Sequence, residues 1–133
     1  MDRTGTGVAS AVALAWAGAC LGLVLTASAA SADDDDRVER EGRCTGSAEW
    51  KVKVRSDDGR LEVEGEVDSN RLGQRWRWTL RHNGSVSYRG WGTTTAPSGS
   101  FEVERTIVDI AGTDRVVFRA RRDDQRCRGV VNY

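Results

Sequence analysis

Residues 75–91 read RWRWTLRHNGSVSYRGW, and this stretch decides the fold. In its first half the apolar side chains Trp76, Trp78 and Leu80 alternate with polar ones. Alternation of period two is typical of a β-strand with one buried face and one wet face. The sequence His82-Asn83-Gly84-Ser85 then predicts a hairpin turn, because Asn and Gly tolerate the positive φ that a tight reversal needs.

The same alternation recurs on both sides of this hairpin. The apolar-polar runs are separated by turn sequences such as Ser56-Asp57-Asp58-Gly59 and Arg122-Asp123-Asp124-Gln125, and no segment after residue 32 has helical spacing. We expect strands at about 49–55, 61–68, 75–81, 86–91, 101–107, 116–121 and 127–131. About seven short strands predict an all-β fold, either an antiparallel β-sandwich or a small barrel, and we choose the sandwich.

The predicted sandwich resembles an immunoglobulin-like or fibronectin type III-like domain over about 90 residues. Trp76 or Trp78 would be the core tryptophan of the third strand of such a domain, and Gly112-Thr113-Asp114 precedes an apolar-polar strand where such a domain begins its sixth. The resemblance implies a fold and no particular activity.

The first 32 residues predict an export signal. Residues 8–25 contain no charged side chain, Arg3 precedes them, and the small residues Ala30-Ser31-Ala32 fit a cleavage site. The alternatives are a retained membrane anchor and a lipid-modified Cys20, but the apolar run continues beyond that cysteine. We therefore expect residues 1–32 to be removed, leaving a secreted chain with no membrane attachment.

The remaining chain divides into two parts. Residues 33–42 carry six acids and two arginines and predict an acidic disordered tail, whereas residues 43–133 form the predicted β-sandwich domain. Cys44 and Cys127 lie near the two ends of that domain, and export favours a disulfide between them over buried free thiols. The bridge would join the first strand to the last.

Catalysis and metal binding find little support in the composition. The chain of 133 residues has a single histidine, His82, and no motif supplies a nucleophile for it to activate. One histidine does not form a multi-histidine metal site, and no glycine-rich phosphate motif is present. We expect no enzyme activity, no cofactor, no catalytic residue and no metal site.

Charge is segregated along the chain. Residues 57–68 hold six acids and one arginine, whereas residues 71–89 hold five arginines and no acid. A hairpin between the two strands would place acids opposite arginines and fix the register. The side chains concerned are Glu62, Glu64, Glu66, Arg75, Arg77 and Arg81.

The alternative interpretation of the same charges is a binding surface. Residues 43–133 hold 17 basic and 13 acidic side chains, and six further arginines between 115 and 128 meet only two acids at a turn. Trp91, between two glycines, is either an exposed platform or a buried strand end. The candidate surface consists of Arg75, Arg77, Arg81, Arg89 and Trp91.

Together these observations predict a secreted, non-enzymatic binding or interaction domain, with association with the cell envelope as one option. Its partner would be an extracellular protein or an anionic envelope polymer, and we expect a monomer. Export and the lack of a recognised motif disfavour nucleic acid. The competing function is inhibition of an extracellular enzyme by a loop such as Thr93 to Ser100, presented from a disulfide-tied scaffold.

Overall fold

The computed structural model describes residues 36–133, so the predicted signal at 1–32 lies outside the described residues. Within them the chain forms eight β-strands and no helix. The strands are β1 (Arg37–Arg43), β2 (Glu49–Asp57), β3 (Arg60–Asp68), β4 (Arg75–His82), β5 (Ser85–Thr93), β6 (Ser100–Val108), β7 (Arg115–Arg122) and β8 (Gln125–Asn132). The predicted all-β class is confirmed.

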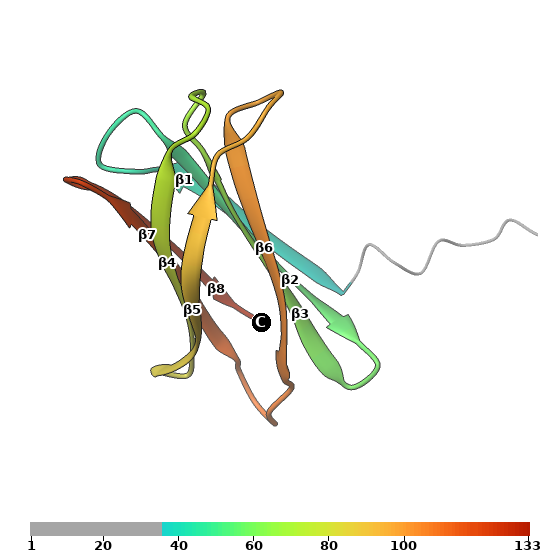
Figure 1. Cartoon of the computed structure of the whole chain (residues 1–133). Helices are drawn as coiled ribbons and strands as arrows, with labels where there is room; N and C mark the ends of the chain where they lie inside the picture. The colour runs from blue at the N-terminus through green and yellow to red at the C-terminus, as the bar shows by residue number, and fades with distance from the viewer. Residues whose placement is uncertain (1–35) are drawn as a thin grey trace, which may run out of the picture. The chain divides into compact units, whose positions relative to one another are not determined.

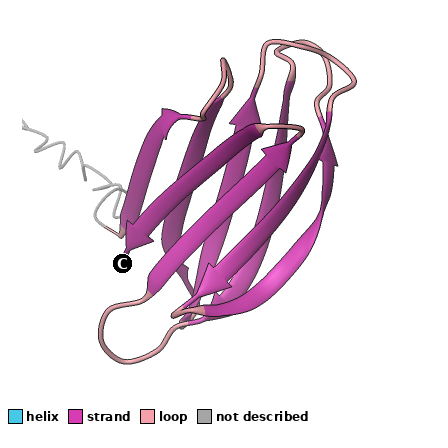
Figure 2. Cartoon of the chain, turned by 90° about the vertical axis from the view of Figure 1, so that its left-hand side faces the viewer, coloured by secondary structure: helices cyan, strands magenta, loops and turns pink. Residues whose placement is uncertain are grey.

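The strands form two antiparallel sheets of four strands each (Figure 1). Sheet A has the order β1-β2-β3-β6, and sheet B has the order β5-β4-β7-β8. Short loops join the strands in Figure 2, and a continuous apolar core draws residues from both sheets, in a β-sandwich-like fold. The core includes Val52, Val54 and Val63 from sheet A and Trp76 and Phe118 from sheet B.

Two of the predicted turns each connect neighbouring strands of one sheet. Asp58 and Gly59 have φ values of 47° and 75° between β2 and β3, and Asn83 and Gly84 have values of 47° and 88° between β4 and β5. Positive φ at both central residues gives the turn a twist that matches the flanking strands. These two turns are therefore confirmed at the predicted residues.

The predicted acidic tail is wrong from Arg37 onward, because that segment forms strand β1 at an edge of sheet A. The strand has one half-buried aliphatic side chain, Val38, so it lacks the apolar alternation that marks the others. Its partners supply the missing stabilisation: Glu39 lies opposite Lys53, and Glu41 lies opposite Lys51. The count of about seven strands thereby becomes eight in the described part of the chain.

The predicted disulfide is confirmed. Cys44 directly follows β1 and Cys127 lies within β8, and their sulfur atoms are bonded across a sequence separation of 83 residues. The hydroxyl of Tyr133 also donates to the carbonyl of Asp36 at 2.9 Å. Covalent and polar links thus tie the start of sheet A to the end of sheet B.

Candidate binding face

The predicted pairing of glutamates with arginines across a hairpin is wrong, because β3 belongs to sheet A and β4 to sheet B. The connection at residues 69–74 crosses from one sheet to the other and is hydrogen-bonded to the equally crossing connection at 94–99. The amide of Ser69 donates to the carbonyl of Gly99, and the amide of Gly73 donates to that of Thr94. The acids and the arginines consequently lie on different sheets.

Two glutamates of β3 form ion pairs with basic residues of β2 instead. The guanidinium of Arg55 pairs with Glu62, with its Nε atom 2.7 Å from the carboxylate, and Lys53 forms an ion pair with Glu64. The hydrogen bond to Glu62 is the main cause that raises the pKa of Arg55 above its ordinary value. Sheet A therefore compensates these charges within its own outer face.

Sheet B carries arginines that no acid on its own strands compensates. Its four strands contain ten arginines and no acidic residue. In β4, exposed or half-buried outward positions alternate with the buried Trp76, Trp78 and Leu80, which fixes the arginines on the outer side. We call the following set the arginine face: Arg75, Arg77, Arg81, Arg89, Trp91, Arg119, Arg121, Arg126 and Arg128.

The five residues predicted from the sequence are all part of this face, and four arginines join them from β7 and β8. The reason is the pairing of β4 with β7, which places Arg121 opposite Arg77 and Arg119 opposite Thr79. No local sequence pattern predicts that pairing, because the two strands are far apart in sequence. Sequence reasoning noted the later arginines and could not join them to the earlier ones.

Strand register arranges the face in two rows that cross the sheet. One row consists of Trp91, Arg77, Arg121 and Arg126, and the other consists of Arg89, Thr79, Arg119 and Arg128, each in the order β5, β4, β7, β8. Neighbouring members of a row are one strand spacing apart, about 4.8 Å. The rows thus form a grid of positive charge across all four strands.

Few protein groups engage these guanidinium groups. Arg81 donates from Nη1 to the carbonyl of Gly84 at 3.0 Å, and the guanidinium of Arg75 lies 4.3 Å from the centroid of the Trp91 ring. Within residues 36–133, none of the eight arginines of the face forms an ion pair. Asp123, in the turn that follows β7, pairs with Arg122 at 3.1 Å.

Two shallow hollows lie on the arginine face. One has a volume of about 500 Å³, and arginines of both rows line it together with Thr79, Ala120 and Cys127. The other, of about 650 Å³, is lined by Gly73, Arg75, Arg77, Trp91, Arg121, Arg122 and Asp123. The face is therefore furrowed, and its second hollow combines aromatic, basic and acidic side chains.

Trp91 is an exposed platform, which decides between the two predicted alternatives. Its side chain is 58% exposed, and it stands opposite Arg77 on the outer side of the sheet. Tyr88 does not share this side, because its hydroxyl donates to the carbonyl of Thr106 on β6 at 2.9 Å. Trp91 is consequently the exposed aromatic residue of the arginine face within the described chain.

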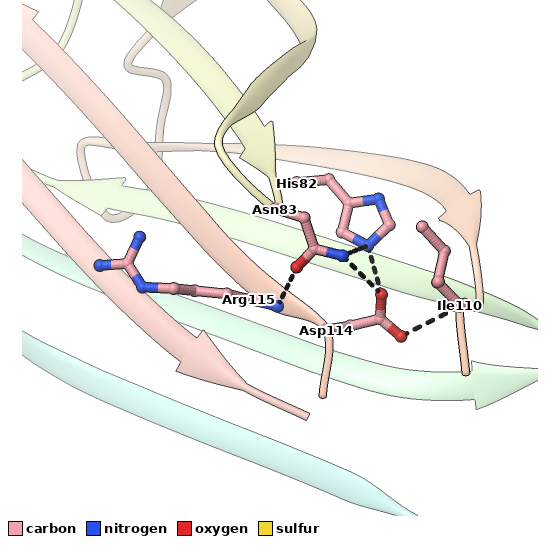
Figure 3. Close-up of polar contacts among 5 residues, drawn as sticks. All are labelled: His82, Asn83, Ile110, Asp114 and Arg115. Atoms are coloured by element: carbon pink, nitrogen blue, oxygen red, sulfur yellow. Dashed lines mark hydrogen bonds and ion pairs between the residues drawn. The ribbon is translucent and has the colours of Figure 1, made fainter. Parts of the chain in front are cut away.

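His82 has a partner that the sequence did not reveal. Figure 3 shows its Nε2 atom bonded to a carboxylate oxygen of Asp114, a residue that is 1% exposed and lies 32 positions later. The side-chain oxygen of Asn83 accepts from the amide of Arg115 at 2.8 Å. This cluster joins the β4–β5 turn to the start of β7.

The electrostatics of the cluster favour an ionised Asp114. Burial alone would raise the pKa of its carboxyl, but the hydrogen bonds from His82 and from the amide of Ile110 outweigh burial and hold the pKa below its ordinary value. Among the described residues, the side-chain partners of His82 are Asp114 and Asn83. In this structure the side chain of His82 therefore links the β4–β5 turn to Asp114.

A group of three carboxylates lies on the outer side of sheet A. One oxygen from each of Glu62, Glu64 and Glu104 falls within 4.8 Å of the others. Arg55 and Lys53 already neutralise two of the three. The group therefore gives no reason to assign a metal ion to this face.

Comparisons with known proteins found no match for this chain. No protein-family model matches the chain, and no curated protein and no solved structure is significantly similar to it. In the described part of the chain, no helix has the length and apolar character needed to cross a bilayer.

Proposed function

We propose that this chain is an exported binding domain without enzymatic activity, and that the arginine face binds an anionic partner outside the cell. The observation that carries the proposal is the segregation of charge on sheet B, where ten arginines lie on four strands that contain no acid. Such a surface has a positive potential that attracts and concentrates anions.

The arrangement of the arginines lowers the stability of the sheet, and the packing of the core does not require it. Arg119 lies directly opposite Arg128, and Arg121 lies directly opposite Arg126. Like charges in directly opposed positions destabilise a sheet. A ligand that brings negative charge to these positions would remove the repulsion, and planar guanidinium groups suit carboxylate and phosphate oxygens in particular.

An extended polymer suits this face better than a compact ion. The two rows run across all four strands, and three strand spacings amount to about 14 Å. An anionic polymer of the cell envelope could occupy several arginines at once, so weak individual contacts would add up. An acidic surface of an extracellular protein is the other partner of suitable charge.

The apolar leader at 8–25 and the bonded cysteine pair support export, since disulfides persist in oxidising compartments. We also propose that the sandwich is of the immunoglobulin-like or fibronectin type III-like kind. The grouping of β2, β3 and β6 in one sheet and β4, β7 and β8 in the other supports this, with β5 beside β4 and β1 as an extra edge strand.

Inhibition of an extracellular enzyme remains a second candidate because the 94–99 loop is rigidly held. The hydroxyl of Thr94 bonds to the carbonyl of Arg71 and accepts from the amide of Gln74 at 2.9 Å. A loop fixed in this way binds with less loss of conformational freedom. A panel of secreted proteases and glycosidases tests it: strong inhibition would support this function, and unchanged rates at micromolar protein would exclude it for the enzymes assayed.

Binding of immobilised polyphosphate by the exported protein tests the main proposal. If about four arginines release counterions, the affinity should fall by about 50-fold between about 50 and 200 mM salt. Arg119→Gln with Arg128→Gln should weaken binding at least about tenfold, which corresponds to about 1.4 kcal/mol. Arg43→Gln with Lys51→Gln removes the same charge from sheet A and should change the affinity far less. Salt-independent binding, or equal effects of the two variants, would contradict the proposal.

A further inference from the structure

The hollow of about 650 Å³ on the arginine face combines basic, aromatic and acidic side chains. Nonspecific attraction of anions requires the basic ones alone. The hollow brings together the indole of Trp91, the guanidinium groups of Arg75, Arg77 and Arg121, and the carboxylate of Asp123. These groups offer an apolar ring face, donors with positive charge and an acceptor with negative charge. A ligand complementary to all three must itself contain an apolar ring face, an anionic group and a hydroxyl donor.

The outward position of Trp91 is built into the packing of the core. Its neighbours Gly90 and Gly92 face inward, and a Cβ atom on Gly92 would stand 2.2 Å from the ring of Phe101. A Cβ on Gly90 would stand 3.0 Å from the ring of Trp78. Because side chains alternate along a strand, these two inward glycines keep the indole on the wet side.

Arg75 fixes the orientation of the indole and leaves one side of it for a ligand. With its guanidinium carbon 4.3 Å from the ring centroid, the arginine stacks on one face of the ring. The side chain of Trp91 is nevertheless 58% exposed, so a large apolar surface remains open to solvent. A sugar ring packs the face that carries its C–H groups on such an aromatic surface.

The row that begins at Trp91 continues as a line of cations. Arg77, Arg121 and Arg126 follow it across β4, β7 and β8 at intervals of about 4.8 Å. This interval is close to the length that one sugar ring adds to a polysaccharide chain. Successive acidic sugars could therefore place carboxylates beside successive arginines while the first ring rests on the indole.

We propose that the anionic partner is an acidic polysaccharide, lying across the strands of sheet B with one sugar ring on Trp91 and carboxylates on Arg77, Arg121 and Arg126. This assignment rests on the proposed function and names the class of its ligand. The carboxylate of Asp123, whose side chain is 74% exposed, accepts a hydrogen bond from a sugar hydroxyl.

The same groups disfavour chains of phosphate. A polyphosphate has no hydroxyl to donate to Asp123 and no ring for Trp91. A single-stranded nucleic acid stacks successive bases on several aromatic side chains, whereas this face presents one exposed aromatic residue in the described chain. An acidic sugar offers a ring for Trp91, a carboxylate for the arginines and a hydroxyl for Asp123.

The test compares oligogalacturonate with polyphosphate of matched charge and with a single-stranded oligodeoxythymidine, by calorimetry on the exported protein. Trp91→Ala should weaken binding of oligogalacturonate by about tenfold, the scale of one lost stacking contact. It should leave polyphosphate binding within about twofold, because electrostatic attraction does not depend on the indole. Trp91→Phe is the matched variant and should restore most of the affinity for oligogalacturonate. Unchanged thermal unfolding confirms that the exposed substitutions leave the fold intact.

The outcomes separate this assignment from the proposed function. If Trp91→Ala leaves oligogalacturonate binding unchanged, or weakens polyphosphate equally, the sugar assignment is wrong while anion binding by the arginines stands. Tighter binding of the oligodeoxythymidine than of oligogalacturonate also overturns it. If the natural sequence binds none of the three anions, both proposals fail.

Discussion

The outer faces of the two sheets share one strand pattern and differ in how their charges are balanced. The strands of sheet A carry ten acidic and eight basic residues, and ion pairs such as Lys53 with Glu64 join neighbouring strands. The strands of sheet B carry ten arginines and no acid. Alternation explains why both faces are charged, since outward positions must be wet. It does not explain why one face is neutralised internally and the other is not.

The difference teaches that charge on a sheet can serve two purposes. On sheet A, opposite charges on adjacent strands stabilise the register and hold the edge strand β1 against β2. On sheet B, like charges on adjacent strands oppose the register, which the buried side chains of β4 and β7 must therefore secure. A face that carries such a cost is a candidate for function.

The largest effect is expected from removing the disulfide that links the two sheets. Cys44→Ala with Cys127→Ala removes a bridge spanning 83 residues, and the chain-entropy account gives a loss of about 4 kcal/mol in the free energy of unfolding. Denaturant unfolding of the exported protein measures it. Reductant should destabilise the natural sequence by a similar amount and leave the double variant unchanged. A loss below about 1 kcal/mol would show that the core alone holds the faces back to back.

The next effect concerns Asp114, the acid that directly precedes the strand bearing Arg119 and Arg121 and that turns inward to His82. Asp114→Asn should lower the free energy of unfolding by about 2 kcal/mol at pH 7, because buried hydrogen bonds to a charged group are lost. Asp124→Asn, at an exposed turn between β7 and β8, is the matched control and should have little effect.

The sign of the acid response follows from the direction of the shift. The pKa of Asp114 in the folded protein lies below its ordinary value of 3.8, so its contribution is complete above that value and is lost as the pH falls through the folded pKa. The natural sequence should therefore lose more stability than the Asn variant does as the pH falls below about 4. Parallel acid curves for the two proteins would show that folding does not lower the pKa of this carboxyl.

The sequence predicted the strands because period-two alternation and turn residues are local signals. It failed for β1, whose residues are held by cross-strand charges on β2 and have one aliphatic side chain between them. It also failed for the connection at 69–74, because periodicity gives the face of a side chain and not the sheet to which its strand belongs.

The candidate site was half predictable for the same reason. Arg75, Arg77, Arg81, Arg89 and Trp91 lie on one hairpin and share a side by alternation, so the sequence finds them. The arginines of β7 and β8 join the face only through the long-range pairing of β4 with β7. Asp114 meets His82 through that same long-range pairing, and no motif spans the two.

Charge removal should have opposite signs on the two faces. Arg119→Gln with Arg128→Gln should raise the free energy of unfolding by about 0.5 kcal/mol, because the two like charges lie directly opposite each other. Lys53→Gln on sheet A should lower it by a similar amount, because Glu64 loses its cation. Denaturant unfolding at low salt measures both effects, which should shrink at high salt as screening increases. Equal signs would remove the contrast between the faces.

The smallest effect tests the weakest point of sheet A, its edge at β6. There Glu102 lies opposite Glu66, and Glu104 lies opposite Glu64, so this edge repeats on a small scale the repulsion of the arginine face. Partial burial, followed by the negative charges of Glu64 and Glu66, raises the pKa of Glu102 above 4.5, while Lys53 acts in the opposite sense.

When folding raises the pKa of a carboxyl, the ionised form is less favourable in the folded state than in the unfolded state. Such a group therefore lowers the free energy of unfolding once the pH exceeds its unfolded pKa. Glu102→Gln should therefore raise the free energy of unfolding by a few tenths of a kcal/mol at pH 7, and this gain should vanish below about pH 4.5. Glu41→Gln is the matched control on the opposite edge, where Lys51 faces the acid, and it should lower stability slightly. A gain from both variants would mean that excess negative charge, and not the local pairing of strands, governs the outer face of sheet A.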